Sequence, residues 1–363
     1  MKKVKIICWS VLAVVLTGVL IFGIINKGEN LMNISFSFLN FGLNETNAKE
    51  ISVTEIPIED FHSIDLNWNN TYVKISKYDG DTIQLTERTE KKLNDDEKLK
   101  YTIENNQLTI DDNSKMSYGF LYMMKTPKIL EMKIPNTKDF ERIDVNTSSA
   151  DIYINDLKSN KFTINTSSGY VSTENTTFNN CNIRSTSGDI SINSSTVDNF
   201  CDINSTSGEI KCNNLKTEKL ETKTTSGDIT FKNAQQNDCY IKSISGEISF
   251  NGDSKTVSFN STSGDIEADG SFSDISVKTV SGESNIKSLQ FPKTFNAEST
   301  SGDIDLYIPD DEKTGFNASV STTSGDFSSN TPLKSSDNYK IYGNGKNKFS
   351  FKTISGDINI TVE

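Results

Sequence analysis

The sequence predicts an all-β fold: a single-stranded right-handed β-helix with coils of about 19 residues, preceded by one N-terminal transmembrane helix. Three observations predict it. A Ser-Gly-Asp/Glu-Ile motif recurs at a nearly constant interval, apolar and polar residues alternate on both sides of it, and an uncharged apolar run lies near the N-terminus. In chain order, we expect a cytoplasmic tip (1–5), a transmembrane anchor (6–25), a juxtamembrane linker (26–50), degenerate first coils that form an N-terminal cap (51–135) and regular β-solenoid repeats (136–363).

The predicted anchor, 6–25, contains no charged side chain. Twenty helical residues span about 30 Å, which is the thickness of the hydrocarbon core of a bilayer. Three lysines precede the run, whereas one lysine and one glutamate follow it closely, so the N-terminus is predicted to stay in the cytoplasm. We therefore expect a single-pass protein of the cell membrane whose C-terminal domain is extracellular. A cleaved signal peptide is the alternative, but the run is long and no small-x-small cleavage site ends it.

The region 51–135 fits the repeat imperfectly. One coil fits around Thr71, which takes the place of the glycine, and a second fits around Asn106. Residues 87–100 form a charged insertion between these two coils, and residues 129–135 form one more strand. We expect these coils to cover the first edge of the solenoid, because an open edge invites the addition of another strand.

The glycine of the motif defines the repeat. It occurs ten times, at Gly169, Gly188, Gly208, Gly227, Gly246, Gly264, Gly282, Gly302, Gly325 and Gly356. Ala150 takes its place in the first regular coil, and serine precedes this position in all eleven coils. Glycine reaches positive φ without steric cost, so we expect a structural turn at each glycine, with the serine hydroxyl bonded to nearby backbone or to the next serine.

The alternation around the glycine predicts two strands in each coil. Apolar residues lie seven and five positions before the glycine and two and four positions after it, with polar residues between them, as for Ile164, Ile183, Ile190 and Ile229. Parallel strands lie about 4.8 Å apart, so eleven coils would form a rod of roughly 50 Å, and crossover connections favour a right-handed winding. Before Gly356 the spacing rises to 31 residues, and we expect the insertion at 328–348 to fold over the exposed last edge.

The cysteines indicate packing rather than disulfide bonds. Cys181, Cys201 and Cys239 share one inward position with leucine, valine and phenylalanine, so we expect buried thiols. Cys181 and Cys201 would lie on adjacent coils, within the Cα separation of a disulfide. Cys8 lies in the predicted anchor.

The residue after the glycine is acidic in ten of the eleven coils, so stacking would place like charges about 5 Å apart, with a repulsion of about 1 kcal/mol per pair in water. One hypothesis is a Ca²⁺ ladder between the coils. Its ligands would be Asp189, Glu209, Asp228, Glu247 and Asp265. The other, which we favour, is that the carboxylates accept backbone N–H bonds at the turn. Lysines four residues before the glycine would assist them, at Lys223, Lys242, Lys278 and Lys352. No other metal and no cofactor is predicted.

Composition narrows the classes of function. The net charge of −12 argues against nucleic-acid binding, which requires a basic face. His62 is the only histidine, which excludes a His-rich metal site and argues against a Ser-His-Asp hydrolase. We expect it to be a surface residue. Polysaccharide lyases are also β-helices, but long loops wall their clefts, and the short spacings here leave no room for such loops up to Gly302. We therefore expect no catalytic residues and no enzyme.

Three stretches resemble a known family. They are 61–75 (FHSIDLNWNNTYVKI), 129–135 (ILEMKIP) and repeats such as 225–229 (TSGDI). Together they are similar to the LiaG-like "putative adhesin" family of bacterial β-strand-repeat proteins, a domain of unknown function. The resemblance implies a β-helical, surface-exposed, non-catalytic domain, linked in some Gram-positive members to the envelope-stress response. It supplies no catalytic or ligand residues.

The predicted function is that of a membrane-anchored extracellular β-solenoid, a non-catalytic adhesin-like or envelope-associated contact module. Its outer faces, rich in Asn, Ser and Thr, would bind an envelope polymer or a membrane protein partner. Two alternatives remain open: an accessory or sensory protein of a cell-envelope stress system, and a polysaccharide-active β-helix enzyme.

Overall fold

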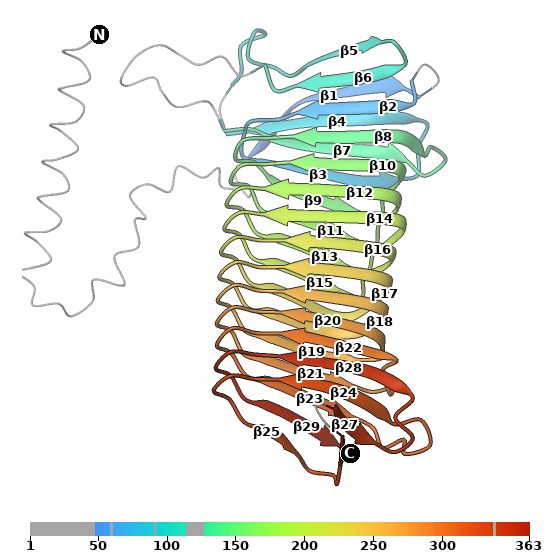
Figure 1. The fold of residues 1–363 in the computed structure, drawn as a ribbon. Coiled ribbons are helices and arrows are strands. Elements are labelled where there is room, and N and C mark those ends of the chain that lie inside the picture. The colour runs from blue at the N-terminus through green and yellow to red at the C-terminus, as the bar shows by residue number, and fades with distance from the viewer. Residues whose placement is uncertain (1–47, 59–60, 91, 114–126, 337–338) are drawn as a thin grey trace, which may run out of the picture. The chain divides into compact units, whose positions relative to one another are not determined.

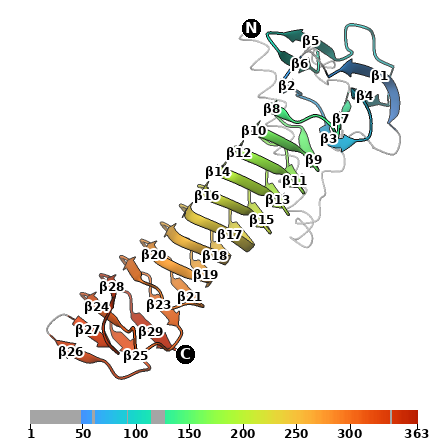
Figure 2. The same cartoon turned by 90° about the vertical axis from the view of Figure 1, so that its right-hand side faces the viewer.

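The computed structural model describes residues 48–58, 61–90, 92–113, 127–336 and 339–363, all of which belong to one compact unit, Asn44–Glu363. In this unit the chain winds into stacked coils (Figure 1). Each regular coil contributes one strand before the glycine corner, to a first wall, and one after it, to a second wall. Each strand of the second wall is followed by a return bend, which leads to the first-wall strand of the next coil. Figure 2 shows the coils following one another in chain order from β8 to β23.

Each wall is a row of neighbouring strands that runs from the N-terminal end of the stack to its C-terminal end. The first wall contains, in this spatial order, β5 (Lys100–Glu104), β6 (Gln107–Asp111), β2 (Ser63–Asn67), β8 (Phe140–Asn146), β10 (Lys158–Asn165), β12 (Thr177–Ser185), β14 (Thr196–Ser205), β16 (Lys216–Lys223), β17 (Ile229–Lys242), β18 (Ile248–Asn260), β20 (Phe272–Lys278), β22 (Thr294–Glu298), β28 (Asn347–Lys352), β24 (Phe316–Ser321), β27 (Tyr339–Tyr342) and β26 (Lys334–Ser336). The second wall contains, in the same direction, β1 (Lys49–Pro57), β4 (Thr82–Thr89), β7 (Ile129–Pro135), β3 (Tyr72–Tyr78), β9 (Asp151–Asn155), β11 (Val171–Glu174), β13 (Ile190–Asn193), β15 (Ile210–Asn213), the first residues of β17 and β18, β19 (Ile266–Gly270), β21 (Ser284–Ser288), β23 (Ile304–Ile308), β29 (Ile358–Val362) and β25 (Phe327–Ser329).

The core lies between the two walls and is built from columns of equivalent residues. Ile164, Ile183 and Ile203 are directly paired on β10, β12 and β14, and all three are fully buried. In the second wall, Ile190 and Ile229 belong to a column that is likewise buried, and it continues along the stack. The predicted inward positions are therefore confirmed, and the parallel pairing in register makes every coil bury its apolar face against its neighbours.

The predicted fold class is wrong in one part. The described residues form 29 strands and no helix, so the fold is all-β and a transmembrane helix does not belong to it. No helix that could cross a membrane is found among the residues that the structure describes. The segment predicted as the anchor, 6–25, lies outside them, as do the predicted tip and all but the last residues of the linker. The N-terminal transmembrane helix is therefore not part of the fold that the structure describes. The handedness of the winding stays a prediction.

The glycine corner is confirmed, but its predicted cause is wrong. In none of the ten motif glycines does φ lie in the positive region. What the glycine provides is space: a Cβ on Gly227 would overlap the carbonyl oxygen of Gly208 in the preceding coil, and a Cβ on Gly208 would overlap that of Gly188. Each corner therefore packs its backbone directly on the backbone of the corner before it.

The hydroxyl that supports the corner is also not the predicted one. The serine directly before the glycine is exposed in the regular coils, and its backbone N–H bonds to the preceding coil, as from Ser226 to the carbonyl of Thr206 (2.9 Å). A serine or threonine three positions before the glycine is buried instead. The glycine N–H donates to it, as from Gly227 to Thr224 Oγ1 (3.0 Å) and from Gly302 to Ser299 Oγ (2.9 Å). This hydrogen bond satisfies the buried N–H of the glycine in each coil where it forms.

Positive φ is needed at the return bend. The residue six positions after the corner has φ between 49° and 57° in five successive coils, at Asp156, Asn175, Ser194, Asn214 and Asn233. Asn and Asp tolerate this left-handed conformation better than most residues. The bend therefore explains why asparagine is abundant at this position of the sequence.

The cysteine prediction is confirmed. Cys181 and Cys201 are directly paired on β12 and β14, and both are free, buried thiols, as are Cys212 and Cys239. Burial raises the pKa of the Cys212 and Cys239 thiols well above the usual range. The hydrogen bond with Cys181, followed by burial, raises the pKa of Cys201 in the same direction. These side chains pack as small apolar groups.

At the N-terminal end the chain departs from sequential order. The coil of β2 and β3 fits around Thr71 as predicted and pairs with β8 and β9, but the coil of β6 and β7 lies outside it, although it comes later in the sequence. Residues 101–110 form an antiparallel hairpin whose turn, Asn105 and Asn106, has positive φ, so the predicted coil around Asn106 is wrong. The strand at 129–135 is confirmed as β7.

The C-terminal end shows the same exchange of order. The last coil, β28 and β29, lies between the coil of β22 and β23 and the coil of β24 and β25. Accordingly, Gly356 stacks on Gly302, and Gly325 stacks on Gly356. The insertion at 328–348 contributes β27, which pairs antiparallel with β24 and covers its free edge, as predicted. The coil that ends the stack is, however, the one before the insertion.

A buried ion pair holds the N-terminal end together. The predicted charged insertion at 87–100 is wrong at its start, because Glu87 lies on β4 with a fully buried side chain. Lys128 Nζ lies 2.7 Å from Glu87 Oε1 and donates to the carbonyls of Glu97 (2.8 Å) and Asp112 (2.6 Å). The ammonium group also lies 5.2 Å from the centre of the Trp68 ring. The lysine thus joins four segments of the cap.

We predict that Gly227→Ala destabilises the protein by roughly 3 kcal/mol, because the added methyl group overlaps the backbone of the preceding coil at Gly208, which is itself held by its own strands. The free energy of unfolding from urea denaturation measures it. The exposed neighbour is the control: Ser226→Ala should change stability by less than about 0.5 kcal/mol. Equal stability of the two variants would contradict the packing explanation.

We predict that Lys128→Met costs about 3–5 kcal/mol, because it leaves the Glu87 carboxylate buried without its cation. The double variant Lys128→Met/Glu87→Leu should recover most of this loss, since neither charge is then buried. Thermal unfolding monitored by circular dichroism gives both values. A double variant that is less stable than Lys128→Met would show that the pair stabilises the fold by more than charge compensation.

Candidate functional site

The acidic residues that directly follow the glycine corners form an acidic edge along the stacked coils. The structure shows how the charges of this edge are accommodated. An aspartate carboxylate accepts the backbone N–H of the residue after the glycine in the neighbouring coil. The bonds run from Glu209 to Asp189 Oδ1 (2.8 Å), from Glu247 to Asp228 Oδ1 (2.9 Å) and from Glu283 to Asp265 Oδ1 (2.9 Å). Tyr170 N donates to Asp151 in the same way (2.8 Å). The favoured hypothesis, that the carboxylates accept N–H bonds at the turn, is confirmed.

In the last three coils of the stack the residue after the glycine is aspartate throughout, and Asp357 N donates to Asp303 Oδ1 (2.7 Å) while Asp326 N donates to Asp357 Oδ1 (2.8 Å). From Asp189 to Glu283 aspartate and glutamate alternate, and the geometry explains this alternation. The shorter aspartate side chain reaches the N–H of the next coil, whereas the glutamate in that coil donates its own N–H and points its carboxylate to solvent. Glu209 Oε2 forms an ion pair with Lys211 (2.7 Å). The predicted assistance by lysines four residues before the glycine is wrong for two of them: Lys223 pairs with Glu221, and Lys278 pairs with Glu298.

The predicted calcium ladder is not assembled as a ligand cluster. Within the described ranges, no group of three or more His, Cys, Asp or Glu side chains is placed to hold a metal ion. Asp189, Asp228 and Asp265 each use one oxygen for a backbone N–H, and the intervening glutamates project outward. Occupancy of this edge by Ca²⁺ stays untested. His62 is exposed at the start of β2, as predicted, and lies apart from the acidic edge on the other side of its coil.

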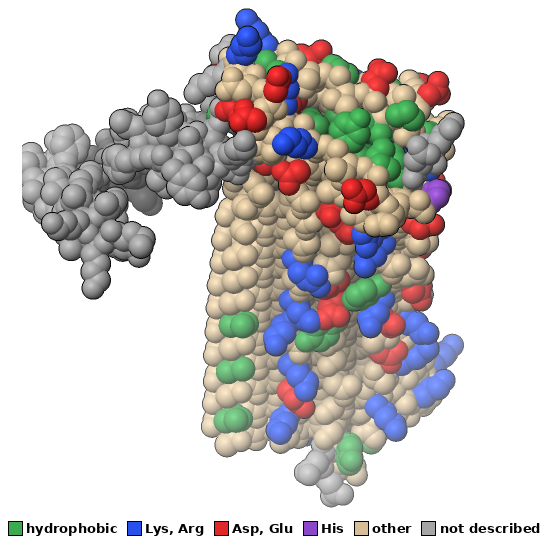
Figure 3. All heavy atoms as spheres, turned by 90° about the horizontal axis from the view of Figure 1, so that it is seen from above, with side chains coloured by type: hydrophobic (Ala, Val, Ile, Leu, Met, Phe, Trp, Pro, Cys, Tyr) green, Lys and Arg blue, Asp and Glu red, His purple; other side chains and the backbone are tan. Residues whose placement is uncertain are grey.

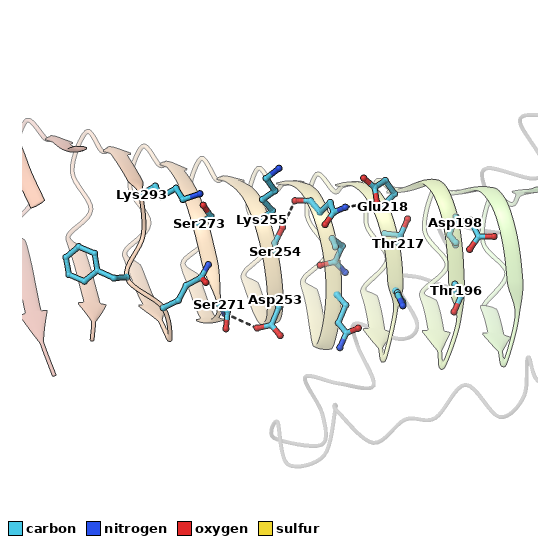
Figure 4. Close-up of a pocket in the computed structure, with 17 residues that line it drawn as sticks. Thr196, Asp198, Thr217, Glu218, Asp253, Ser254, Lys255, Ser271, Ser273 and Lys293 are labelled. Carbon is cyan, nitrogen blue, oxygen red and sulfur yellow. Dashed lines mark hydrogen bonds between the residues drawn. The ribbon is translucent and has the colours of Figure 1, made fainter. Parts of the chain in front are cut away.

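A groove of about 730 Å³ runs along the return bends, on the side opposite the glycine corners. Figure 4 shows its lining residues on successive coils along one side of the solenoid. The lining comprises 196–198, 216–218, 235–237 and 253–255, followed by Ser271, Ser273, Gln290, Phe291 and Lys293. Six coils contribute, so at a coil spacing of about 4.8 Å the groove extends over roughly 24 Å. This volume lies within the range of ligand-binding pockets.

One column of the core changes from apolar to polar where its middle part, from Val197 to Ser254, forms the floor of the groove. The column runs through Phe178, Val197, Thr217, Gln236, Ser254 and Phe272, each directly paired with the next. Its three central side chains are polar although they are only 5%, 6% and 4% exposed. Thr217 and Ser254 donate to the carbonyls of Lys219 (3.2 Å) and Thr256 (2.9 Å). Gln236 Nε2 makes one long bond, to Leu215 O (3.4 Å), and Gln236 Oε1 has no partner among the described residues.

The rim of the groove carries both charges. The lining contains three carboxylates, Asp198, Glu218 and Asp253, and three ammonium groups, Lys216, Lys255 and Lys293, so it is neutral overall. Two of the carboxylates are already engaged. Glu218 accepts from Asn237 Nδ2 (2.7 Å), and Asp253 accepts the backbone N–H of Ser271 (3.0 Å). Amide and hydroxyl groups dominate the rest.

Sequence reasoning missed the groove. The sequence predicts only a polar return after the second strand, without an inward column. The signal was present, because the position eight or nine residues after the glycine carries Phe178 and Val197 in two coils and then Thr217, Gln236 and Ser254. A run of three polar residues between coils that carry Val197 and Phe272 at this position marks a place where the core is interrupted.

Comparison with known proteins now gives the family. The Toastrack DUF4097 family model matches residues 61–250 and 201–361. The chain belongs to the Toastrack DUF4097 family. The predicted LiaG-like assignment within it is not confirmed. No curated protein sequence matches this Toastrack chain significantly.

Solved structures are similar to the chain at low identity. A "putative cell adhesion protein" from Clostridium sporogenes is 13% identical, covers 87% of this chain and 100% of its own, and has a TM-score of 0.20. A "putative adhesin" from Parabacteroides distasonis is 12% identical, with coverages of 87% and 98% and a TM-score of 0.37. A "putative lipid binding protein" from the same organism is 16% identical, with coverages of 88% and 98% and a TM-score of 0.36. Such scores carry no conclusion about function.

We predict that millimolar Ca²⁺ leaves the melting temperature of the protein unchanged, because the aspartates of the acidic edge are already bonded to backbone N–H groups. Differential scanning calorimetry with Ca²⁺, and with Mg²⁺ as the ionic-strength control, measures it. A rise specific to Ca²⁺ would restore the ladder hypothesis, since ligand binding to the folded state stabilises it.

Proposed function

We propose that this Toastrack protein is a non-catalytic, adhesin-like contact module that acts at the cell surface and binds an envelope polymer or protein along its ordered polar walls. The observation that carries the proposal is the network of asparagine side chains that links neighbouring coils on the outside of the solenoid. Asn165 Nδ2 donates to Asn146 Oδ1 (3.0 Å), Asn179 Nδ2 to Asn160 Oδ1 (2.8 Å) and Asn213 Nδ2 to Asn193 Oδ1 (2.8 Å).

These bonds fix the outer side chains at the spacing of the coils. A surface whose amide groups are held in place loses less conformational entropy on binding than one with free side chains. Figure 3 shows a face on which uncharged polar side chains and backbone predominate, with basic and acidic groups interspersed. A wall of this kind offers repeated hydrogen-bonding groups without a strong field of one sign, which suits contact with a neutral or mixed polymer.

The groove supports binding rather than turnover. Two of its three carboxylates are held by Asn237 and by the backbone of Ser271, so they act as acceptors within the wall. General acid–base catalysis needs a carboxyl group that is free to exchange a proton with the substrate. The side chains of the floor, Thr217, Gln236 and Ser254, can donate and accept hydrogen bonds but are poor acids and bases.

The test is binding of the full chain, immobilised on a sensor, to purified bacterial envelope polymers and to solubilised envelope protein. We expect saturable binding to at least one of them, lost after heat unfolding of the chain, and no change in the chain length of a bound polymer by mass spectrometry. Absence of binding to every fraction would refute the contact function. Shortening of the polymer would refute the non-catalytic part.

A further inference from the structure

We propose that the return-bend groove is the ligand site of this contact module and that it takes an extended, uncharged, polyhydroxylated chain, that is, a neutral glycan. The inference rests on the proposed function, which it deepens by naming the site and the class of ligand. Four properties of the groove carry it: the unpartnered carbonyl oxygen of the Gln236 amide on its floor, its direction relative to the strands, its neutral charge and its length.

The floor holds a hydrogen-bonding group that the fold does not satisfy. Gln236 is nine-tenths buried and lines the groove, and its Oε1 has no partner among the described residues. A buried carbonyl oxygen without a donor is costly. Thr217 and Ser254 flank it in the same column and complete a polar strip in a core that is apolar on both sides. The oxygen itself is covered in the unbound protein, so we infer that the Gln236 side chain changes rotamer when a ligand binds, and a hydroxyl group of the ligand then supplies the missing donor.

The direction of the groove selects against a peptide that binds as an added strand. The groove crosses β14, β16, β17, β18 and β20 along the axis of the stack. The backbone groups of these strands are already paired with a coil on each side. Strand addition requires a free edge with unpaired N–H and C=O groups. Recognition here depends on side chains, whose amides and hydroxyls match the donors and acceptors of sugar hydroxyls.

Charge and length complete the assignment. The lining carries three carboxylates and three ammonium groups, so neither a polyanion nor a polycation is favoured. Equivalent positions repeat on six coils over roughly 24 Å, so the site presents similar groups at regular intervals. A repetitive site of this length fits a chain of identical neutral units.

The test uses the full chain and a linear hexasaccharide of N-acetylglucosamine as the probe, with dissociation constants from isothermal titration calorimetry. Gln236→Met keeps the volume but removes the amide, and we expect it to weaken binding about tenfold or more. Because it also removes an unsatisfied buried oxygen, the melting temperature should stay the same or rise. A purely structural role for Gln236 would lower the melting temperature instead.

The matched control is Thr222→Val. Thr222 is fully buried on β16 and its Oγ1 also lacks a partner among the described residues, but it belongs to the core column between Ile203 and Ile241 and does not line the groove. This variant should raise the melting temperature and leave the dissociation constant unchanged. Gln235→Trp, which fills the groove from an exposed position, provides a second route to lost binding that does not touch the core.

The outcomes separate the two proposals. Binding of the hexasaccharide that Gln236→Met and Gln235→Trp both weaken supports the groove as a glycan site. Binding of envelope polymers that neither variant alters overturns the groove and leaves the contact function standing. Preferential binding of an uncharged Gly-Ser peptide or of polyglutamate at the groove overturns the glycan class. Failure of the full chain to bind any envelope fraction overturns the contact function and the groove together.

Discussion

The close contact of backbone with backbone at the glycine corner is the constraint on which the rest of this Toastrack structure depends. At Gly208 and Gly227 there is no room for a Cβ, because the carbonyl of the previous corner occupies its place. Every coil is therefore held in register with its neighbour at one fixed point, and the two strands that leave the corner pair directly with their equivalents. The buried serine or threonine three positions earlier satisfies the glycine N–H in most coils, so the contact carries little polar cost.

The acidic edge follows from the same constraint. Once the corners are stacked, the N–H after each glycine points along the edge, and a carboxylate one coil away is its natural acceptor. Hydrogen bonds to a carboxylate are stronger than those between neutral groups, and they offset the repulsion between neighbouring charges. From Asp189 to Glu283 only one carboxylate in two reaches across, so Asp228 is short and Glu247 can be long, whereas in the last coils Asp303 and Asp357 both accept an N–H from the next coil. The ladder of charge is thus a consequence of stacking and requires no metal ion to explain it.

The sequence predicted the regular coils well and the ends poorly, for a physical reason. Period-two alternation and a fixed spacing report contacts between neighbouring coils, and these decide columns such as Ile164 and Ile183. The order of the coils at either end depends instead on long-range pairing. Nothing in the local pattern shows that Gly356 stacks on Gly302 rather than on Gly325, or that Glu87 is buried against Lys128. The groove is an intermediate case. Its sequence signal is local, because Thr217, Gln236 and Ser254 are polar at a repeat position where the adjoining coils carry Val197 and Phe272.

A solenoid tolerates a local polar interruption of its apolar core. Its stability is close to a sum of terms between neighbouring coils, so a costly group in one coil disturbs only the coils beside it. The polar strip around Gln236 is bounded by aromatic packing on both sides: Phe178 stacks on Phe162 with ring centres 4.4 Å apart, and Phe272 lies 5.9 Å from Phe250. These rings hold the walls together where the column is apolar, so the unsatisfied amide is confined to the middle of the groove. The same fold can therefore place a binding site in one group of coils while the remaining coils keep the rod rigid.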